Sequence, residues 1–146
     1  MKILFPVDGS DYSLRAAHFL VAHLAWFKTY PELHLLHVKL PIPPGLALTR
    51  AAAVLGDNVV DQYYAEEASE AMAGARAVLD AHRIPFQVHW CVGDVATEIS
   101  RHAAELGAEL IVMGSHGHGA FRNLVLGSVT TKVLASETAM PVLIVR

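Results

Sequence analysis

Short aliphatic runs and longer amphipathic stretches alternate along the chain. Five runs rich in Ile, Leu and Val predict β-strands, at residues 2–7, 33–38, 86–92, 110–113 and 142–145. In the stretches between them apolar residues recur at steps of three and four, which is the period of an amphipathic helix. This spacing predicts one helix that starts at Ser10 and ends before Pro31, and further helices at 59–81, 95–106 and 128–136.

The order of these elements, β-α-β-α-β-α-β-α-β, predicts an α/β fold in a single domain over residues 1–146. Strands that are separated by helices pair in parallel through right-handed crossovers, and the helices then cover both faces of the sheet. We therefore expect a doubly wound, five-stranded parallel sheet with helices on both faces. Such sheets bind ligands beyond the carboxyl ends of their strands, where the strand order reverses.

Several residues lie where helices are expected to begin or end. Ser10, Asp94 and Ser128 are candidate N-caps, because a side-chain oxygen can accept a hydrogen bond from a free N–H group of the first turn. Gly107 follows the third predicted helix and suits the left-handed backbone that ends many helices. The segment Pro41 to Asn58 resists assignment, since its prolines forbid a regular element at its start.

Composition and charge narrow the class of protein. Hydrophobic residues make up 53% of the 146 residues, which excludes intrinsic disorder, and no apolar run reaches the ~18–20 residues that span a bilayer. Asp8 and turn residues stand where a secretion signal needs a long apolar stretch. The net charge of −3 and the pI of about 6.3 argue against duplex nucleic acid and anionic membranes as partners. We expect a cytoplasmic protein that binds no nucleic acid and enters no membrane.

The most specific chemical signal is a glycine-rich sequence after the fourth predicted strand, from Met113 to Gly119, which continues into Gly127-Ser128 at the start of the last helix. Glycine lets the backbone approach a ligand closely, and successive N–H groups can then converge on an anion. A helix N-terminus adds unpaired N–H groups and a favourable dipole. Ser128 and Thr130 add hydroxyl donors. This arrangement predicts a phosphate-binding site.

The glycines do not match the two most familiar nucleotide motifs. A Walker loop is excluded because the chain has no Gly-Lys dipeptide. The dinucleotide fingerprint needs G-x-G-x-x-G after the first strand, whereas the glycines here fall as G-x-x-G-x-G after the fourth. A nicotinamide-dependent dehydrogenase is therefore disfavoured.

The spacing of Gly114-x-x-Gly117, nine further residues and then Gly127-Ser128 resembles the nucleotide-binding signature of universal stress proteins. Other segments support the resemblance from the first strand to the last: ILFPVDGSDYSLRA, HWCVGDVATEI, AELIVMGSHG and the ending MPVLIV. The resemblance implies the adenine nucleotide alpha hydrolase-like form of the doubly wound fold. It also implies the ATP-binding subgroup, which the complete glycine signature marks.

Roles for individual residues follow from the resemblance by position. Gly114, Gly117, Gly127 and Ser128 are expected to hold the phosphates, with Val129 and Thr130 completing the anion site and His118 beside it. Adenosine is expected against residues at the other strand ends: Pro6, Val7 and Asp8, with Asp8 near the ribose, and Val38 and Met113 on either side of adenine. Mg²⁺ is expected to arrive with ATP, because it binds through phosphates and few protein groups. Arg122 could add charge to the phosphates. The resemblance also implies a homodimer that pairs through the last strand, Val142 to Val145, which would otherwise be an exposed edge.

Other groups of reactive residues give weaker evidence for a function than the glycine-rich sequence does. No dedicated transition-metal site is expected, because among the nine histidines only His116 and His118 are placed to converge. Cys91 is the single cysteine, which excludes an internal disulfide. It shares the more polar face of the 86–92 strand with His89, opposite Phe86, Val88, Trp90 and Val92, and this alternation predicts one less buried face. Cys91 itself is expected to be a buried small residue and not the exposed, activated thiolate of a Cys–His nucleophile.

Three functions stay open at this point. The first is an ATP-binding regulatory module of the stress response, with no catalytic residue assigned. The second is a slow ATPase or nucleotidyl transferase that uses the same pocket with Asp8 as base. The third is a dimeric stress protein that binds no nucleotide. We favour a binding role for Asp8, since no second carboxylate or lysine motif joins it at the strand ends.

Overall fold

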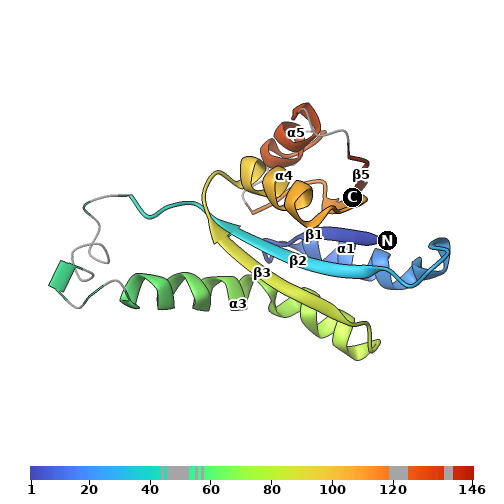
Figure 1. Cartoon of the computed structure of the whole chain (residues 1–146), viewed down its shortest axis with the longest axis horizontal. Coiled ribbons are helices and arrows are strands. Elements are labelled where there is room, and N and C mark those ends of the chain that lie inside the picture. The colour runs from blue at the N-terminus through green and yellow to red at the C-terminus, as the bar shows by residue number, and fades with distance from the viewer. Residues whose placement is uncertain (44, 46–52, 55, 57, 119–124, 137–139) are drawn as a thin grey trace.

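The computed structural model describes residues 1–43, 45, 53, 54, 56, 58–118, 125–136 and 140–146. Its centre is a five-stranded parallel sheet in the order β3-β2-β1-β4-β5 (Figure 1). The strands are β1 (Lys2–Pro6), β2 (Glu32–Lys39), β3 (Phe86–Val92), β4 (Leu110–Gly114) and β5 (Val142–Val145). The predicted α/β class and parallel sheet are confirmed, and the strand order reverses between β1 and β4.

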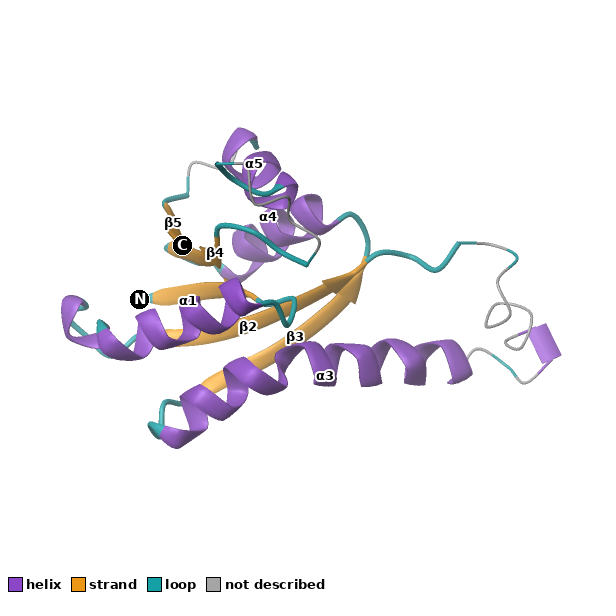
Figure 2. Cartoon of the chain, turned by 180° about the vertical axis from the view of Figure 1, so that it is seen from behind, coloured by secondary structure: helices purple, strands orange, loops and turns teal. Residues whose placement is uncertain are grey.

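Helices cover both faces of the sheet (Figure 2). On one face lie α1 (Asp11–Ala22) and α3 (Asn58–Ala81), and on the other lie α4 (Val95–Leu106) and α5 (Ser128–Ala135). A short 3₁₀ turn, η1 (Leu24–Trp26), follows α1, so this helix ends earlier than its apolar period indicates. No helix in the described ranges is long and apolar enough to cross a membrane.

The helix starts are capped largely as predicted. The Ser10 hydroxyl accepts a hydrogen bond from the Ser13 N–H at 3.3 Å, and Asp94 accepts one from the Thr97 N–H at 3.1 Å. Gly107 ends α4 in left-handed backbone with φ of 61°. The caps at Ser10 and Asp94 fix the turns that follow β1 and β3, and both turns lie at the carboxyl edge of the sheet.

The prediction that Ser128 caps the last helix is wrong. Gly127 is the N-cap of α5, no side chain caps this helix, and Ser128 is its first helical residue. The chain turns at Gly127 because its N–H donates to the Ser115 carbonyl at 2.8 Å. A side chain there would meet the His116 Cα, since a Cβ built on Gly127 lies 3.1 Å from that atom.

The sheet separates two apolar cores. Ile3 and Phe5 of β1 point into the core beneath α1 and α3, and Leu4 points into the core beneath α4 and α5. All three side chains are fully buried. A central strand buried on both faces reads as an unbroken apolar run, which is why β1 is evident from the sequence.

The expected burial of β3 is wrong at two positions. Val88 and Trp90 are each 40% exposed, although they belong to the face that sequence alternation marks as the buried one. On the opposite face Cys91 packs against the core beneath α4, and the His89 Nε2 lies 3.0 Å from the His34 Nδ1 of β2. The reason is the strand order, because β3 is an edge strand and alternation along it does not show which helix covers which face. Most of the segment Pro41 to Asn58 lies outside the described residues.

Candidate functional site

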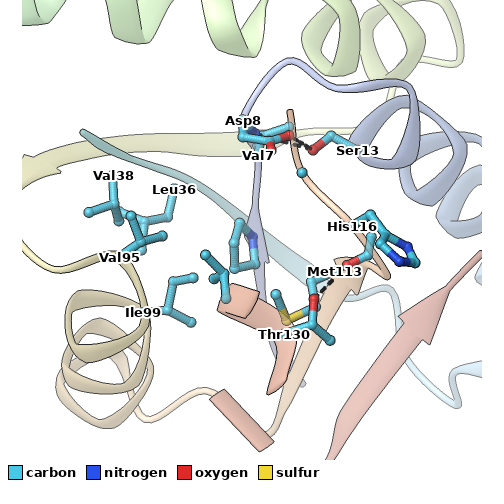
Figure 3. Close-up of a pocket in the computed structure, with 14 residues that line it drawn as sticks. Val7, Asp8, Ser13, Leu36, Val38, Val95, Ile99, Met113, His116 and Thr130 are labelled. Atoms are coloured by element: carbon cyan, nitrogen blue, oxygen red, sulfur yellow. Dashed lines mark hydrogen bonds between the residues drawn. The ribbon is translucent and has the colours of Figure 1, made fainter. Parts of the chain in front are cut away.

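A pocket opens at the carboxyl edge of the sheet, between the ends of β1, β2 and β4 and the starts of α4 and α5 (Figure 3). The space between the lining residues, including the part that is open to solvent, is about 610 Å³. The pocket lies where the strand order reverses, which is the ligand position expected for a doubly wound sheet.

One side of the pocket is apolar. Val38 at the end of β2 and Val95 and Ile99 of α4 lie together on this side (Figure 3). Leu36, Met113 and Val129 also line the pocket. This wall is an apolar surface without charged side chains, against which a flat ring of a ligand could pack.

Asp8 follows β1 and carries the polar side of the pocket. Its Oδ1 accepts hydrogen bonds from the Ser10 N–H at 3.0 Å and the Ser13 hydroxyl at 2.7 Å, and its Oδ2 accepts one from the His118 N–H at 3.3 Å. Burial by itself raises the pKa of this carboxyl, but the hydrogen bonds from Ser10 and Ser13 outweigh it, so the pKa lies below its ordinary value. Asp8 is therefore an anion that ties β1 and α1 to the loop after β4.

Gly117 is the glycine that borders the pocket most tightly. A Cβ built on it lies 2.5 Å from the Asp8 Oδ2, far inside normal contact. The carboxylate can hold its place only if residue 117 has no side chain. The same absence leaves the backbone of this loop accessible from the pocket.

Gly114 and Gly127 serve close packing of the backbone. A Cβ at Gly114 lies 2.7 Å from the Tyr12 Cβ and 2.8 Å from its carbonyl carbon, so this glycine lets α1 lie directly against the end of β4. Through the bond from Gly127 to the Ser115 carbonyl described above, the two halves of the glycine signature meet beside the pocket. The structure thus brings together Ser115 and Gly127, which are twelve positions apart in the sequence.

The start of α5 lies beside the pocket, which Val129 and Thr130 line. The N–H groups of a first helical turn have no partner within the helix, and in α5 these belong to Ser128, Val129 and Thr130. The Thr130 hydroxyl, expected as a ligand donor, instead donates to the carbonyls of Gly114 and Ser115 at 3.2 and 3.3 Å. Thr130 therefore holds the loop against α5 in this structure.

Most of the residues expected at the site line the pocket: Pro6, Val7, Asp8, Val38, Met113, Gly114, Gly117, Val129 and Thr130. His118, Gly127 and Ser128 lie next to these residues along the chain and do not line it. Arg122 lies outside the described residues. The sequence reasoning missed Leu36, Ser13, His116, Val95 and Ile99. For Val95 a signal was available, since this residue begins the helix that follows β3 and therefore lies at the same edge of the sheet.

Cys91 lies outside the pocket and packs against the core beneath α4. Burial raises the pKa of the Cys91 thiol to about 11, so this cysteine is no activated nucleophile. His116 and His118, the two histidines that the sequence places near each other, do not belong to a group of three possible metal ligands among the described residues. Among the described residues, the group of three whose ligand atoms all lie within 4.8 Å of one another is Cys91, Glu98 and His102.

Comparison with known proteins decides the family. The model of the universal stress protein family matches residues 1–146. The chain is a universal stress protein. It is 32% identical to the universal stress protein YxiE of Bacillus subtilis, over 99% of this chain and 98% of that protein.

Solved structures of universal stress proteins agree with this assignment. The protein MJ0577 of Methanocaldococcus jannaschii superposes with a TM-score of 0.72 at 30% identity, over 99% of this chain and 94% of that one. A universal stress protein from Archaeoglobus fulgidus, solved in complex with dAMP, has a TM-score of 0.67 at 21% identity, over 100% of this chain and 98% of that one. Two further structures of the same fold contain cAMP and AMP. Some structural neighbours of this universal stress protein thus bind adenine nucleotides.

Proposed function

We propose that this universal stress protein binds ATP, together with Mg²⁺, and acts as a nucleotide-dependent regulatory module of the stress response. The observation that carries the proposal is the division of one pocket, at the strand-order reversal, into an apolar side and a polar side formed by Asp8, Gly117 and the start of α5. The adenine nucleotides held by structural neighbours support the same ligand class.

The pocket offers a place for each part of the nucleotide. The apolar wall formed by Val38, Val95 and Ile99 fits the adenine ring, which gains by leaving water. The Asp8 carboxylate is suited to accept hydrogen bonds from ribose hydroxyls. The phosphates fit against Gly117 and the start of α5, where backbone N–H groups favour an anion.

The charge around the pocket explains why Mg²⁺ belongs to the proposal. None of the described residues that line the pocket is Lys or Arg. Backbone N–H groups and the dipole of α5 supply only partial positive charge. A magnesium ion on the phosphates would neutralise the remaining negative charge and would need few ligands from the protein. Mg²⁺ supplies charge neutralisation when bound, and the chain supplies position.

Binding fits Asp8 better than catalysis does. A general base needs a pKa near the working pH. The pKa of Asp8 lies below its ordinary value, so its carboxylate is a weak base at neutral pH. Its geometry serves to position groups.

The proposal is tested by calorimetry with Mg·ATP on the native chain and on Gly117→Ala. We expect saturable binding to the native chain and a loss of roughly 10–100-fold in affinity for the variant, because the added Cβ displaces the Asp8 carboxylate and forfeits a charged hydrogen bond of about 1.5–3 kcal/mol. Gly74→Ala is the matched control, since a Cβ there meets only the Leu14 Cδ1 at 3.6 Å, outside the pocket. Absence of binding to the native chain, or equal losses in both variants, contradicts the proposal.

We also propose that two copies of the chain associate through β5. This strand is an edge of the sheet, paired with β4 on one side, and all four of its residues are half-buried. An unpaired apolar edge is a site for strand pairing between chains. Size-exclusion chromatography with light scattering tests this by measuring the molar mass in solution. We expect twice the chain mass of 15.8 kDa.

A further inference from the structure

Cys91, Glu98 and His102 form a cluster on the sheet face covered by α4. Cys91 lies near the end of β3, and the other two residues lie on α4. The Cys91 Sγ is 4.0 Å from the His102 Nδ1, and that nitrogen is 3.7 Å from the Glu98 Oε2. None of the three side chains lines the nucleotide pocket, so the cluster is a separate feature.

The local fold builds this cluster from a strand, a turn and one helical face. Glu98 and His102 are four residues apart on α4, which places their side chains on the same side of the helix. The turn residue Gly93 makes room for Glu98, because a Cβ built on Gly93 would lie 2.7 Å from the Glu98 Cγ. Cys91 faces α4 and packs against the core on that side. The three side chains are half-buried, so a small ion can reach them from solvent.

The combination of a thiol, an imidazole and a carboxylate is the donor set of zinc sites. With Zn–S of about 2.3 Å and Zn–N or Zn–O of about 2.1 Å, tetrahedral geometry separates the ligand atoms by roughly 3.4–3.6 Å. The separations of 4.0 and 3.7 Å in the cluster are within about half an ångström of these values. We propose that Cys91, Glu98 and His102 bind a zinc-class divalent cation, with water in the fourth position.

The protonation states make binding a proton-releasing step. The high pKa of Cys91 means that its thiol is protonated at neutral pH. The incoming cation forms a metal–sulfur bond as the S–H bond breaks, and one proton goes to the buffer. The hydrogen bond from Arg101 holds the pKa of Glu98 below its ordinary value, so this ligand is already ionised. No oxidation or reduction is involved.

Hydrogen bonds to the Glu98 carboxylate and to the His102 ring, including one from the Arg101 Nη2 to the His102 Nδ1 at 3.3 Å, define how the ligands must adjust when the cation binds. The Arg101 Nη2 and Nε donate to the Glu98 Oε2 at 2.6 and 3.0 Å, and such outer contacts orient a ligating carboxylate. The His102 Nδ1 also lies 3.1 Å from the Glu98 backbone carbonyl. To bind the cation this nitrogen must present its lone pair, so the proton resides on Nε2 in the bound form. Binding therefore fixes the His102 tautomer.

The test uses the nucleotide-free chain and two probes, Zn²⁺ for affinity and Co²⁺ for the ligand set. We expect one Zn²⁺ per chain and a near-ultraviolet charge-transfer band from thiolate to Co²⁺. Because Cys91 is the single cysteine, that band identifies it. Cys91→Ser abolishes the band. Cys91→Ser and His102→Ala each weaken Zn²⁺ binding by more than the ~10–100-fold that loss of an outer-shell partner causes.

His82→Ala is the matched control, because the His82 Nδ1 also lies against a backbone carbonyl four residues earlier, at 2.9 Å from the Val78 oxygen, on an exposed helix end. The control should keep both the band and the affinity, and circular dichroism confirms that each variant is folded. Absence of the band, or equal Zn²⁺ affinity in the native chain and folded His102→Ala, overturns the proposal. The result is independent of ATP binding, since no nucleotide is present.

Discussion

Replacing Asp8 by asparagine removes the acceptor on which three hydrogen-bond donors converge. The carboxylate receives the Ser10 N–H, the Ser13 hydroxyl and the His118 N–H. An asparagine side chain has one acceptor oxygen and one NH₂ group. Whichever way the amide is turned, its NH₂ group faces a donor, so at least one of these hydrogen bonds is lost.

The expected cost follows from the contact that disappears. A hydrogen bond to a charged group contributes about 1.5–3 kcal/mol, and we take about 2 kcal/mol because Asp8 is half-buried. For a chain of this length that loss corresponds to a fall in Tm of roughly 4–8 °C. The same change removes the anion proposed to meet the ribose, so the affinity for Mg·ATP should also fall.

The pH dependence separates this cause from a general loss of packing. The pKa of Asp8 in the folded chain lies below its ordinary value, because hydrogen bonds outweigh the effect of burial. Its contribution to the free energy of unfolding is therefore complete above the unfolded pKa of about 3.9 and is lost as the pH falls through the folded pKa. We expect a full difference between the native chain and Asp8→Asn at pH 7, and no difference in strong acid.

Thermal unfolding followed by circular dichroism across this pH range is the assay. Asp80→Asn serves as the control, because Asp80 is an exposed carboxylate near the end of α3 whose replacement leaves the pocket unchanged. If Asp8→Asn unfolds at the same temperature as Asp80→Asn at pH 7, the hydrogen-bond network around Asp8 contributes no stability and the reasoning fails. A difference that persists unchanged into acid would contradict the electrostatic cause.

Three further substitutions test other parts of the structure. Gly114→Ala should lower the free energy of unfolding by about 1–3 kcal/mol in a calorimetric scan, since its Cβ collides with the backbone of Tyr12; an unchanged Tm would refute this. Val38→Trp should fill the apolar side of the pocket and weaken Mg·ATP binding by more than about tenfold in calorimetry. Undiminished affinity would mean that the adenine ring binds elsewhere. Ile144→Lys puts a charge on the β5 edge and should give a monomer in light scattering, whereas an intact dimer would locate the interface on another surface.

The elements of the fold could be predicted from local patterns because each has a distinct period. β1 reads as an unbroken apolar run since both of its faces are covered. Alternation predicted β3 as a strand, but the burial of Val88 and Trp90 depends on which strands lie beside β3. That order results from pairings between distant segments, and the sequence of one strand does not contain it.

The pocket could be predicted in outline for a similar reason. Strand ends in a parallel sheet meet at one edge, so Asp8, Val38 and Met113 could be grouped without the structure. Ile99 could not, because on α4 it reads as an ordinary core residue, and it is indeed 1% exposed. The orientation of the Thr130 hydroxyl depends on the two carbonyls it meets, which only the folded loop brings near.

The cluster of Cys91, Glu98 and His102 shows a further limit of sequence reasoning. Its two helical members have the regular four-residue spacing, but the cysteine joins them across a strand–turn–helix connection. No fixed spacing marks such a group. The distance between the β3 end and the first turns of α4 is set by Gly93 and by the cap at Asp94.

The most direct test of the central claim is a titration of the ¹⁵N-labelled chain with Mg·ATP. The backbone amide signals in two-dimensional NMR spectra report where the nucleotide binds. The claim is that the amides near Gly117 and at the start of α5 receive the phosphates while the wall at Val38 receives adenine. We expect saturable shifts that are largest at Gly117, Ser128 and Val129, with smaller shifts at Val38. Absence of shifts at saturating Mg·ATP, or shifts centred on another part of the chain, would contradict it.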